Sequence, residues 1–246
     1  MFIKNNIFEG KEAILLDMNG TFMFGEDRFS LDENFYSYYR QLDGKLSEIK
    51  VNEIIRSAYD YLESKYHDER YVNNFPSVEK AILNVINFSL SDSELKKLVD
   101  TFSYHELGNI PLEFVVALYK LKKHFTLACV IDIWSPNKLW RDAFVKAEVY
   151  DLFSVLSFSS DEGIVKPSPE PFEKVLEKLE LTKDKVLIVG DSIRRDLGGA
   201  TASEIDCVLV GGAMHEDAVG TFSDLIELSN SFFNGDYNES QSIKNI

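Results

Sequence analysis

Short runs of consecutive apolar residues divide the chain, and between them apolar residues recur every three or four positions. The runs lie at 13–16, 126–131, 155–158, 186–189 and 207–210. Uninterrupted apolar runs of this length are typical of strands that are buried on both faces. The pattern therefore predicts a sheet with a covering layer on each side.

Helical periodicity fills most of the spaces between the later runs, at 112–121, 138–146, 169–181 and 196–203. Strands that alternate with helices are joined by right-handed crossovers, which make the strands parallel. We therefore expect an α/β fold with a doubly wound parallel sheet of the Rossmann type.

The long segment between the first and second apolar runs has a different pattern. Residues 30–102 show helical periodicity only, and residues 22–29 have the character of a loop. The Ser-x-x-Glu sequences that start at Ser30 and Ser91 have the spacing of a capping box at a helix start. We expect an all-helical domain inserted after the first strand.

These patterns divide the chain into three parts. We expect an α/β core built from residues 1–21 and 103–230, interrupted by a helical cap domain at 22–102. Residues 231–246 are polar, and we expect a flexible tail there.

The charge balance excludes some partners. The chain carries 41 acidic and 26 basic residues, a net charge of −15. Nucleic acids and anionic membrane surfaces are bound by clustered Lys and Arg, so we expect neither as a partner. No apolar stretch approaches the ~20 residues that span a bilayer. Residues 1–11 lack the apolar core of a signal peptide, and we expect a soluble, cytoplasmic protein.

Acidic residues directly follow two of the predicted strands. Asp17 comes after 13–16, and Asp191 comes after 186–190, with Asp196 five residues further on. The carboxyl ends of parallel strands meet at one edge of a sheet, so these acids can lie together and hold a hard cation such as Mg²⁺. Each acid taken singly could instead cap a turn or a helix.

Two further features point to the same edge. Lys166 lies just before a helix-start signal at 168–170, which would bring its ammonium group beside Asp17. Gly20 permits a tight turn, and exposed amides at Gly20 and Thr21 could hold an anion. A lysine on a loop is otherwise most often a solvated surface residue.

The order of these features resembles the motifs of the haloacid dehalogenase (HAD) superfamily of hydrolases. Asp17-Met18-Asn19-Gly20-Thr21 resembles its first motif, Lys166-Pro167 its third, and Gly190-Asp191-Ser192 with Asp196 its fourth. The helical insert resembles the cap placed between the first two motifs. The resemblance covers residues 12–215 and implies a HAD-like fold.

The resemblance also implies an activity. Asp17 would attack a small phosphorylated metabolite and form an aspartyl-phosphate, which water would then hydrolyse. Mg²⁺ would bind the carboxylates of Asp17 and Asp191 and the backbone carbonyl of Asn19. Lys166 would stabilise the transferring group.

The remaining motif positions would support this chemistry. Contacts to the substrate would come from the turn residues Gly20 and Thr21 and from the second motif at Asp132 and Ser135. Ser192 and Asp196 would hold the ligands in place.

The first motif departs from that of the family's phosphatases at Asn19. Those phosphatases carry a second aspartate there, which protonates the leaving group and then activates water. An amide cannot exchange a proton in this way, and loss of a general acid–base typically costs ~10²–10⁴-fold in rate. The nucleophile and the backbone carbonyl are unchanged.

The second motif departs at Asp132, where the family has Ser or Thr. An ionised Asp132 would repel a phosphate charge ~4 Å away by roughly 4 kcal/mol at an effective dielectric constant near 20. The carboxyl could be protonated, it could turn away from the phosphate, or it could cap the helix that starts near Asn137. Alternatively, Ser135 could reach the phosphate in its stead.

Three functions are compatible with these motifs. The first is a Mg²⁺-dependent phosphatase, slow or specialised for good leaving groups. The second is a catalytically impaired member that binds a small anion or a protein partner. The third is dehalogenation, which would not need the second acid, although Lys166 with two downstream acids fits phosphoryl chemistry better. We favour the phosphatase.

Overall fold

A six-stranded parallel sheet forms the centre of the computed structural model, which describes residues 7–232. The strand order is β3-β2-β1-β4-β5-β6. The strands are β1 (Ala13–Leu16), β2 (Thr126–Ile131), β3 (Phe153–Phe158), β4 (Val186–Gly190), β5 (Asp206–Leu209) and β6 (Gly220–Thr221). Every neighbouring pair is parallel, which confirms the predicted sheet.

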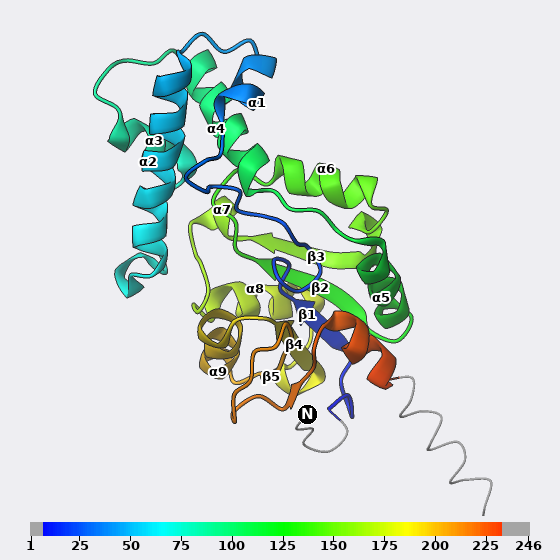
Figure 1. Cartoon of the computed structure of the whole chain (residues 1–246). Coiled ribbons are helices and arrows are strands. Elements are labelled where there is room, and N and C mark those ends of the chain that lie inside the picture. Colours follow the sequence, from blue (N-terminus) through cyan, green and yellow to red (C-terminus); the bar gives the residue numbers. More distant parts are fainter. Residues whose placement is uncertain (1–6, 233–246) are drawn as a thin grey trace, which may run out of the picture.

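Helices cover both faces of this sheet. Consecutive residues of a strand point to opposite faces, so a strand that is apolar throughout needs an apolar layer on each side. Ile14 and Leu16 of β1 belong to an apolar cluster shared with α5 (Leu112–Lys122) and α6 (Lys138–Lys146). Ala13 and Leu15 belong to a second apolar cluster, shared with α8 (Glu170–Leu179) and α9 (Gly198–Ser203). The remaining core helices are α7 (Ser159–Glu162), a π-helical segment η4 (Ile193–Leu197) and a final helical segment at 225–232. Figure 1 shows the two layers.

A block of helices is inserted between β1 and β2, as predicted, and stands apart from the sheet (Figure 1). Its elements are α1 (Tyr36–Gln41), α2 (Glu48–Tyr66), η1 (Glu69–Tyr71), α3 (Val78–Val85) and α4 (Asp92–Glu106). The block has an apolar core of its own, which includes side chains from each of α1 to α4. This insertion is confirmed, and we call residues 22–102 the cap.

The exact division of the chain stays a proposal. We place the core at 1–21 and 103–230, although α4 runs through the boundary and ends at Glu106. The predicted tail at 231–246 lies outside the described residues from 233 onward.

One predicted helix start is wrong. The capping box at Ser30 predicted a helix there, but α1 begins at Tyr36 after Phe35, without a side-chain cap. The amides of Phe35 and Tyr36 instead donate to the Asn52 side chain of α2. At Ser91 the prediction is confirmed, since its hydroxyl accepts the Glu94 amide.

The cap and the core are joined by backbone hydrogen bonds and by apolar contact. The Phe75 amide donates to Gly163 over 2.7 Å, and the Val165 amide donates to Val72 over 2.8 Å. Trp134 and Val165, although outside the cap in sequence, belong to its apolar core. Within residues 7–232, no helix combines the length and the apolar character needed to cross a membrane.

Candidate active site

The ends of β1 and β4 bring the predicted acids together. These strands are neighbours, and the Asp17 amide donates to the Val189 carbonyl over 2.8 Å. Two glycines allow the close approach. A Cβ atom on Gly20, whose φ is +69°, would lie 2.2 Å from Asp191 Oδ2, and one on Gly190 would lie 2.2 Å from Asp196 Cγ.

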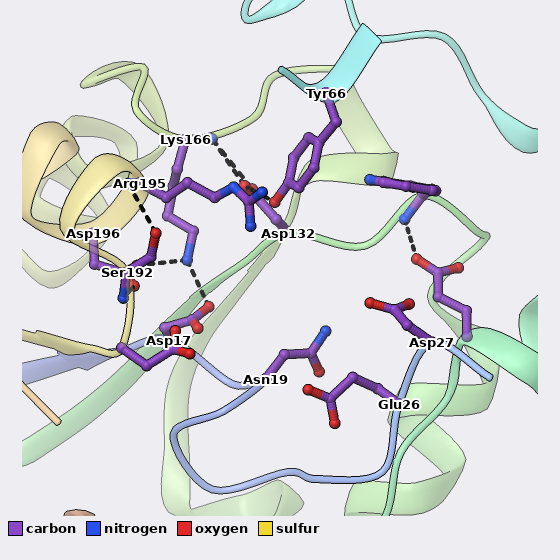
Figure 2. A pocket seen from close by; sticks show the side chains of 13 residues that line it. Asp17, Asn19, Glu26, Asp27, Tyr66, Asp132, Lys166, Ser192, Arg195 and Asp196 are labelled. Atoms are coloured by element: carbon purple, nitrogen blue, oxygen red, sulfur yellow. Dashed lines mark hydrogen bonds and ion pairs between the residues drawn. The ribbon is translucent and has the colours of Figure 1, made fainter. Parts of the chain in front are cut away.

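Lys166 joins the two strand ends. Its Nζ lies 2.5 Å from Asp17 Oδ1 and 2.7 Å from Asp196 Oδ1, and its side chain is buried. Burial alone would lower the pKa of Lys166, but the charges of Asp17 and Asp196 outweigh burial and raise it. The lysine therefore stays charged. Figure 2 shows its ammonium group between the carboxylates of Asp17 and Asp196.

The carboxylates outnumber the charge that Lys166 can balance. The pKa of Asp17 is raised to about 8 in total, because burial and the charges of Asp196 and Asp191 raise it more than Lys166 lowers it. Like charges this close are costly unless a cation lies between them. The site is therefore short of positive charge.

The donor set fits a divalent hard cation. Carboxylate oxygens of Asp17, Asp191 and Asp196 lie within 4.8 Å of one another, a grouping found at one place among residues 7–232. Asn19 Oδ1 beside them is buried with no hydrogen-bond partner. Because Asp196 also accepts from Lys166 and the Ser192 amide, Asp17 and Asp191 are the freer ligands. Carboxylates, carbonyls and water are what Mg²⁺ prefers.

Asp132 faces the same cavity and connects the core to the cap. Its carboxyl accepts from the Tyr66 hydroxyl over 2.9 Å and from the Lys166 amide over 3.1 Å (Figure 2). Burial raises its pKa, and Lys166 and Tyr66 lower it. Asp132 therefore neither turns away nor caps α6.

Tyr66 ends α2 and is held from a second side. The Arg195 guanidinium lies 3.8 Å from the centre of its ring, a cation–π contact. The neighbouring Arg194 donates to the His67 carbonyl over 2.9 Å. The two arginines thus hold the end of α2 against the core.

Three predicted substrate-binding residues do not reach the cavity wall. The amides of Gly20 and Thr21 donate to Met23 and Met18 within the turn, over 3.0 and 3.2 Å. Ser135 is fully buried, and its amide donates to Glu106 over 3.0 Å. The binding roles given to these residues stay predictions, without support from their positions.

The cavity has a volume of about 160 Å³ and an acidic wall. Its lining holds the predicted residues Asp17, Asn19, Asp132, Lys166, Asp191, Ser192 and Asp196, together with Glu26, Asp27, Tyr66, Glu106, Trp134 and Arg195. The sequence patterns gave no site role to this second group. The only signal was the pair Glu26 and Asp27, next to the flexible Gly25 behind the first motif.

A sequence model of the haloacid dehalogenase-like hydrolases matches residues 45–210, which hold Lys166, Asp191 and Asp196. The chain belongs to this family. The match begins after Asp17, so the assignment of the first motif rests on its sequence and on the geometry described above.

The relatives found by sequence are distant, and their names are those of enzymes that act on phosphorylated compounds. Pyrophosphatase PpaX of Halalkalibacterium halodurans is 29% identical over 199 residues, 74% of this chain and 86% of its own. Glyceraldehyde 3-phosphate phosphatase of Pyrococcus furiosus is 31% identical over 83 residues, and the match spans only 34% of either chain.

Solved structures share the fold. A HAD phosphatase from Thermococcus onnurineus has a TM-score of 0.60 at 19% identity, covering 90% of this chain and 97% of its own. A 2-haloacid dehalogenase from Pseudomonas syringae has a TM-score of 0.61 at 16% identity, covering 91% and 99%. At such low identity the likeness concerns the fold alone.

Proposed function

We propose that this hydrolase is a Mg²⁺-dependent phosphatase that acts on a small phosphorylated metabolite through an aspartyl-phosphate on Asp17. The observation that carries the proposal is the grouping of Asp17, Asp191 and Asp196 around Lys166. Three carboxylates around one ammonium group, two of them buried, leave a negative charge that a divalent cation would balance.

In this proposal Asp17 attacks phosphorus in line with the leaving group. Lys166, which is already within hydrogen-bond reach of Asp17, places its positive charge beside the transferring oxygens. Asp196 orients the lysine, since it accepts the second hydrogen bond from Nζ. The carboxylates of Asp17 and Asp191 and the backbone carbonyl of Asn19 would hold Mg²⁺, which would supply positive charge to the phosphoryl group and favour the ionised nucleophile.

The size of the cavity and the names of the relatives support a small substrate. About 160 Å³ is below the ~300–1,000 Å³ of typical ligand pockets. Pyrophosphatase PpaX and glyceraldehyde 3-phosphate phosphatase are named for small phosphorylated compounds. We propose that this chain has a substrate of the same class, in the cytoplasm, without nucleic-acid or membrane partners.

Asn19 is the observation that favours a second candidate, a catalytically impaired protein that binds a small anion or a protein partner. The two candidates differ in turnover. We expect the purified protein to release phosphate from p-nitrophenyl phosphate or pyrophosphate with Mg²⁺, and to stop when EDTA is added. Asp17→Asn should abolish release while its melting temperature shows that it is folded. Anion binding without phosphate release would favour the second candidate.

A further inference from the structure

The acid–base function that Asn19 cannot perform needs another group in the cavity. We propose that Asp27 is the general acid–base of this site. The inference rests on the proposed phosphatase function and names a further catalytic residue for it.

Elimination among the acids of the cavity wall leads to Asp27. Asp17 and Asp196 are bonded to Lys166, and Asp132 accepts from Tyr66 and the Lys166 amide. Both oxygens of Glu106 accept backbone amides, from Trp134 over 2.5 Å and from Ser135 over 3.0 Å.

Asp191 would bind the cation, so Glu26 and Asp27 are the two acids that remain. One oxygen of Glu26, Oε2, is buried without a partner, so Glu26 is the less accessible of the two to substrate and water. The Asp27 carboxyl opens onto the cavity and takes part in no side-chain hydrogen bond or ion pair among residues 7–232. It is therefore free to exchange a proton.

The backbone fixes the direction of Asp27. Its φ is +54°, a left-handed conformation that costs non-glycine residues about 1–2 kcal/mol. The Arg28 amide donates to the His105 carbonyl over 2.8 Å, and the Phe29 amide donates to Asp27 over 2.8 Å. This turn is thus fastened to the end of α4. Figure 2 shows the Asp27 carboxyl directed into the cavity on the side of Asn19, across from Asp17 and Lys166.

The surroundings of Asp27 suit a group that gains and loses a proton near neutral pH. The pKa of Asp27 is raised to about 7 in total, because loss of hydration, Glu26 and Glu63 of α2 raise it more than Arg195 lowers it. Glu106 of α4 also faces it, because Asp27 raises the pKa of Glu106 in turn. The ideal pKa of a catalytic acid–base lies near the working pH.

The proposed steps balance. In the first, an oxygen of Asp17 bonds to phosphorus, the bond from phosphorus to the leaving oxygen breaks, and Asp27 gives that oxygen its proton, directly or through one water. In the second, a water oxygen bonds to phosphorus, its proton passes to Asp27, and the bond between phosphorus and Asp17 breaks. The net reaction is hydrolysis, and both carboxyls return to their first state.

The test compares Asp27→Asn with wild type. Asparagine also tolerates a left-handed backbone, so the loop should keep its shape. We expect turnover of an alkyl phosphate such as β-glycerophosphate to fall ~10²–10⁴-fold. With p-nitrophenyl phosphate, whose leaving group needs no proton, we expect a burst of one p-nitrophenol per protein and then slow steady turnover. The basic limb of the pH profile near 7 should disappear.

Two further variants separate proton transfer from a change of local charge. Glu63→Gln removes a nearby charge outside the cavity wall, so the basic limb of the pH profile should move to lower pH while turnover at the optimum stays that of wild type. Asn19→Asp in the Asp27→Asn background should restore turnover of β-glycerophosphate, because it returns a carboxyl to the family's usual position.

The tests distinguish a failure of the Asp27 role from a failure of the proposed phosphatase function. If Asp17→Asn is inactive while Asp27→Asn matches wild type on β-glycerophosphate and keeps the pH limb, the role of Asp27 is wrong and the phosphatase stands. An equal loss in Glu63→Gln and Asp27→Asn would also overturn it. A wild type without Mg²⁺-dependent turnover would overturn both.

Discussion

Lys166 Nζ lies within 2.7 Å of carboxylate oxygens on both Asp17 and Asp196, so one buried ammonium group links the end of β1 to the segment that follows β4. The lysine comes from a third segment, between α7 and α8. Asp17 and Lys166, which are 149 positions apart, therefore meet at one point of the sheet edge.

Removal of this ammonium should destabilise the fold as well as stop turnover. Lys166→Met leaves two buried carboxylates without their partner, and breaking a buried pair costs about 3–5 kcal/mol. Urea unfolding of the metal-free protein measures this loss. Lys96→Met is the matched control, because the Lys96–Asp100 pair is exposed and worth at most about 1 kcal/mol. Equal losses in the two variants would contradict the buried network.

Magnesium binding should depend on Asp191. We expect Mg²⁺ to bind the wild type in calorimetry and to raise its melting temperature, because a ligand of the folded state stabilises it. Asp191→Asn should lose both effects. Asp142→Asn, on the exposed face of α6, should keep them. Unchanged binding in Asp191→Asn would reject the assigned site.

Gly20→Ala should damage the same site through steric contact, in addition to the backbone strain at a φ of +69°. The added methyl group would lie 2.2 Å from Asp191 Oδ2, so the carboxylate must move and Mg²⁺ affinity should fall at least tenfold. Gly212→Ala is the control, because Gly212 also has a positive φ, +86°, but nothing lies within 4 Å of the added atom. That variant should show backbone strain of about 1–3 kcal/mol with normal Mg²⁺ affinity. Equal affinities in the two variants would argue against a tight fit at Gly20.

The stability of the metal-free protein should fall as the pH rises from about 5 to about 8. The pKa of Glu106 is raised from 4.5 to about 8 in total, because burial and Asp27 raise it more than the amides of Trp134 and Ser135 lower it. The folded state therefore favours the protonated acid, and this contribution is full below pH 4.5 and is lost as the pH passes through about 8. Urea unfolding at several pH values should show a flatter profile in Glu106→Gln. An identical slope in both proteins would contradict this role of Glu106.

The sequence predicted the features that follow from periodicity and strand ends. Buried parallel strands have continuous apolar runs, and this revealed the sheet and placed Asp17 and Asp191 at one edge. It did not reveal Glu106, because that acid lies at the end of a cap helix and reaches the cavity only through the packing of α4 on the core. The helix start expected at Ser30 fails partly for a similar reason, since Asn52 of the distant α2 accepts the amides of Phe35 and Tyr36, the second of which Asn34 also accepts.

Asp132 is a further case in which packing decides. From sequence its carboxyl had four possible roles, and none included a residue of the cap. The hydroxyl of Tyr66 binds it only because Arg195 and the end of α2 meet above the sheet edge. Such contacts depend on the relative position of two domains, which no local pattern encodes.

The central claim is that Asp17 carries the phosphoryl group during turnover. The most direct test is peptide mass spectrometry of protein quenched in acid during reaction with p-nitrophenyl phosphate and Mg²⁺. We predict a phosphoryl group on the peptide that contains Asp17, which disappears with EDTA and in Asp17→Asn. Phosphate release by the wild type with no modified peptide, or with a label that persists in Asp17→Asn, would contradict the account.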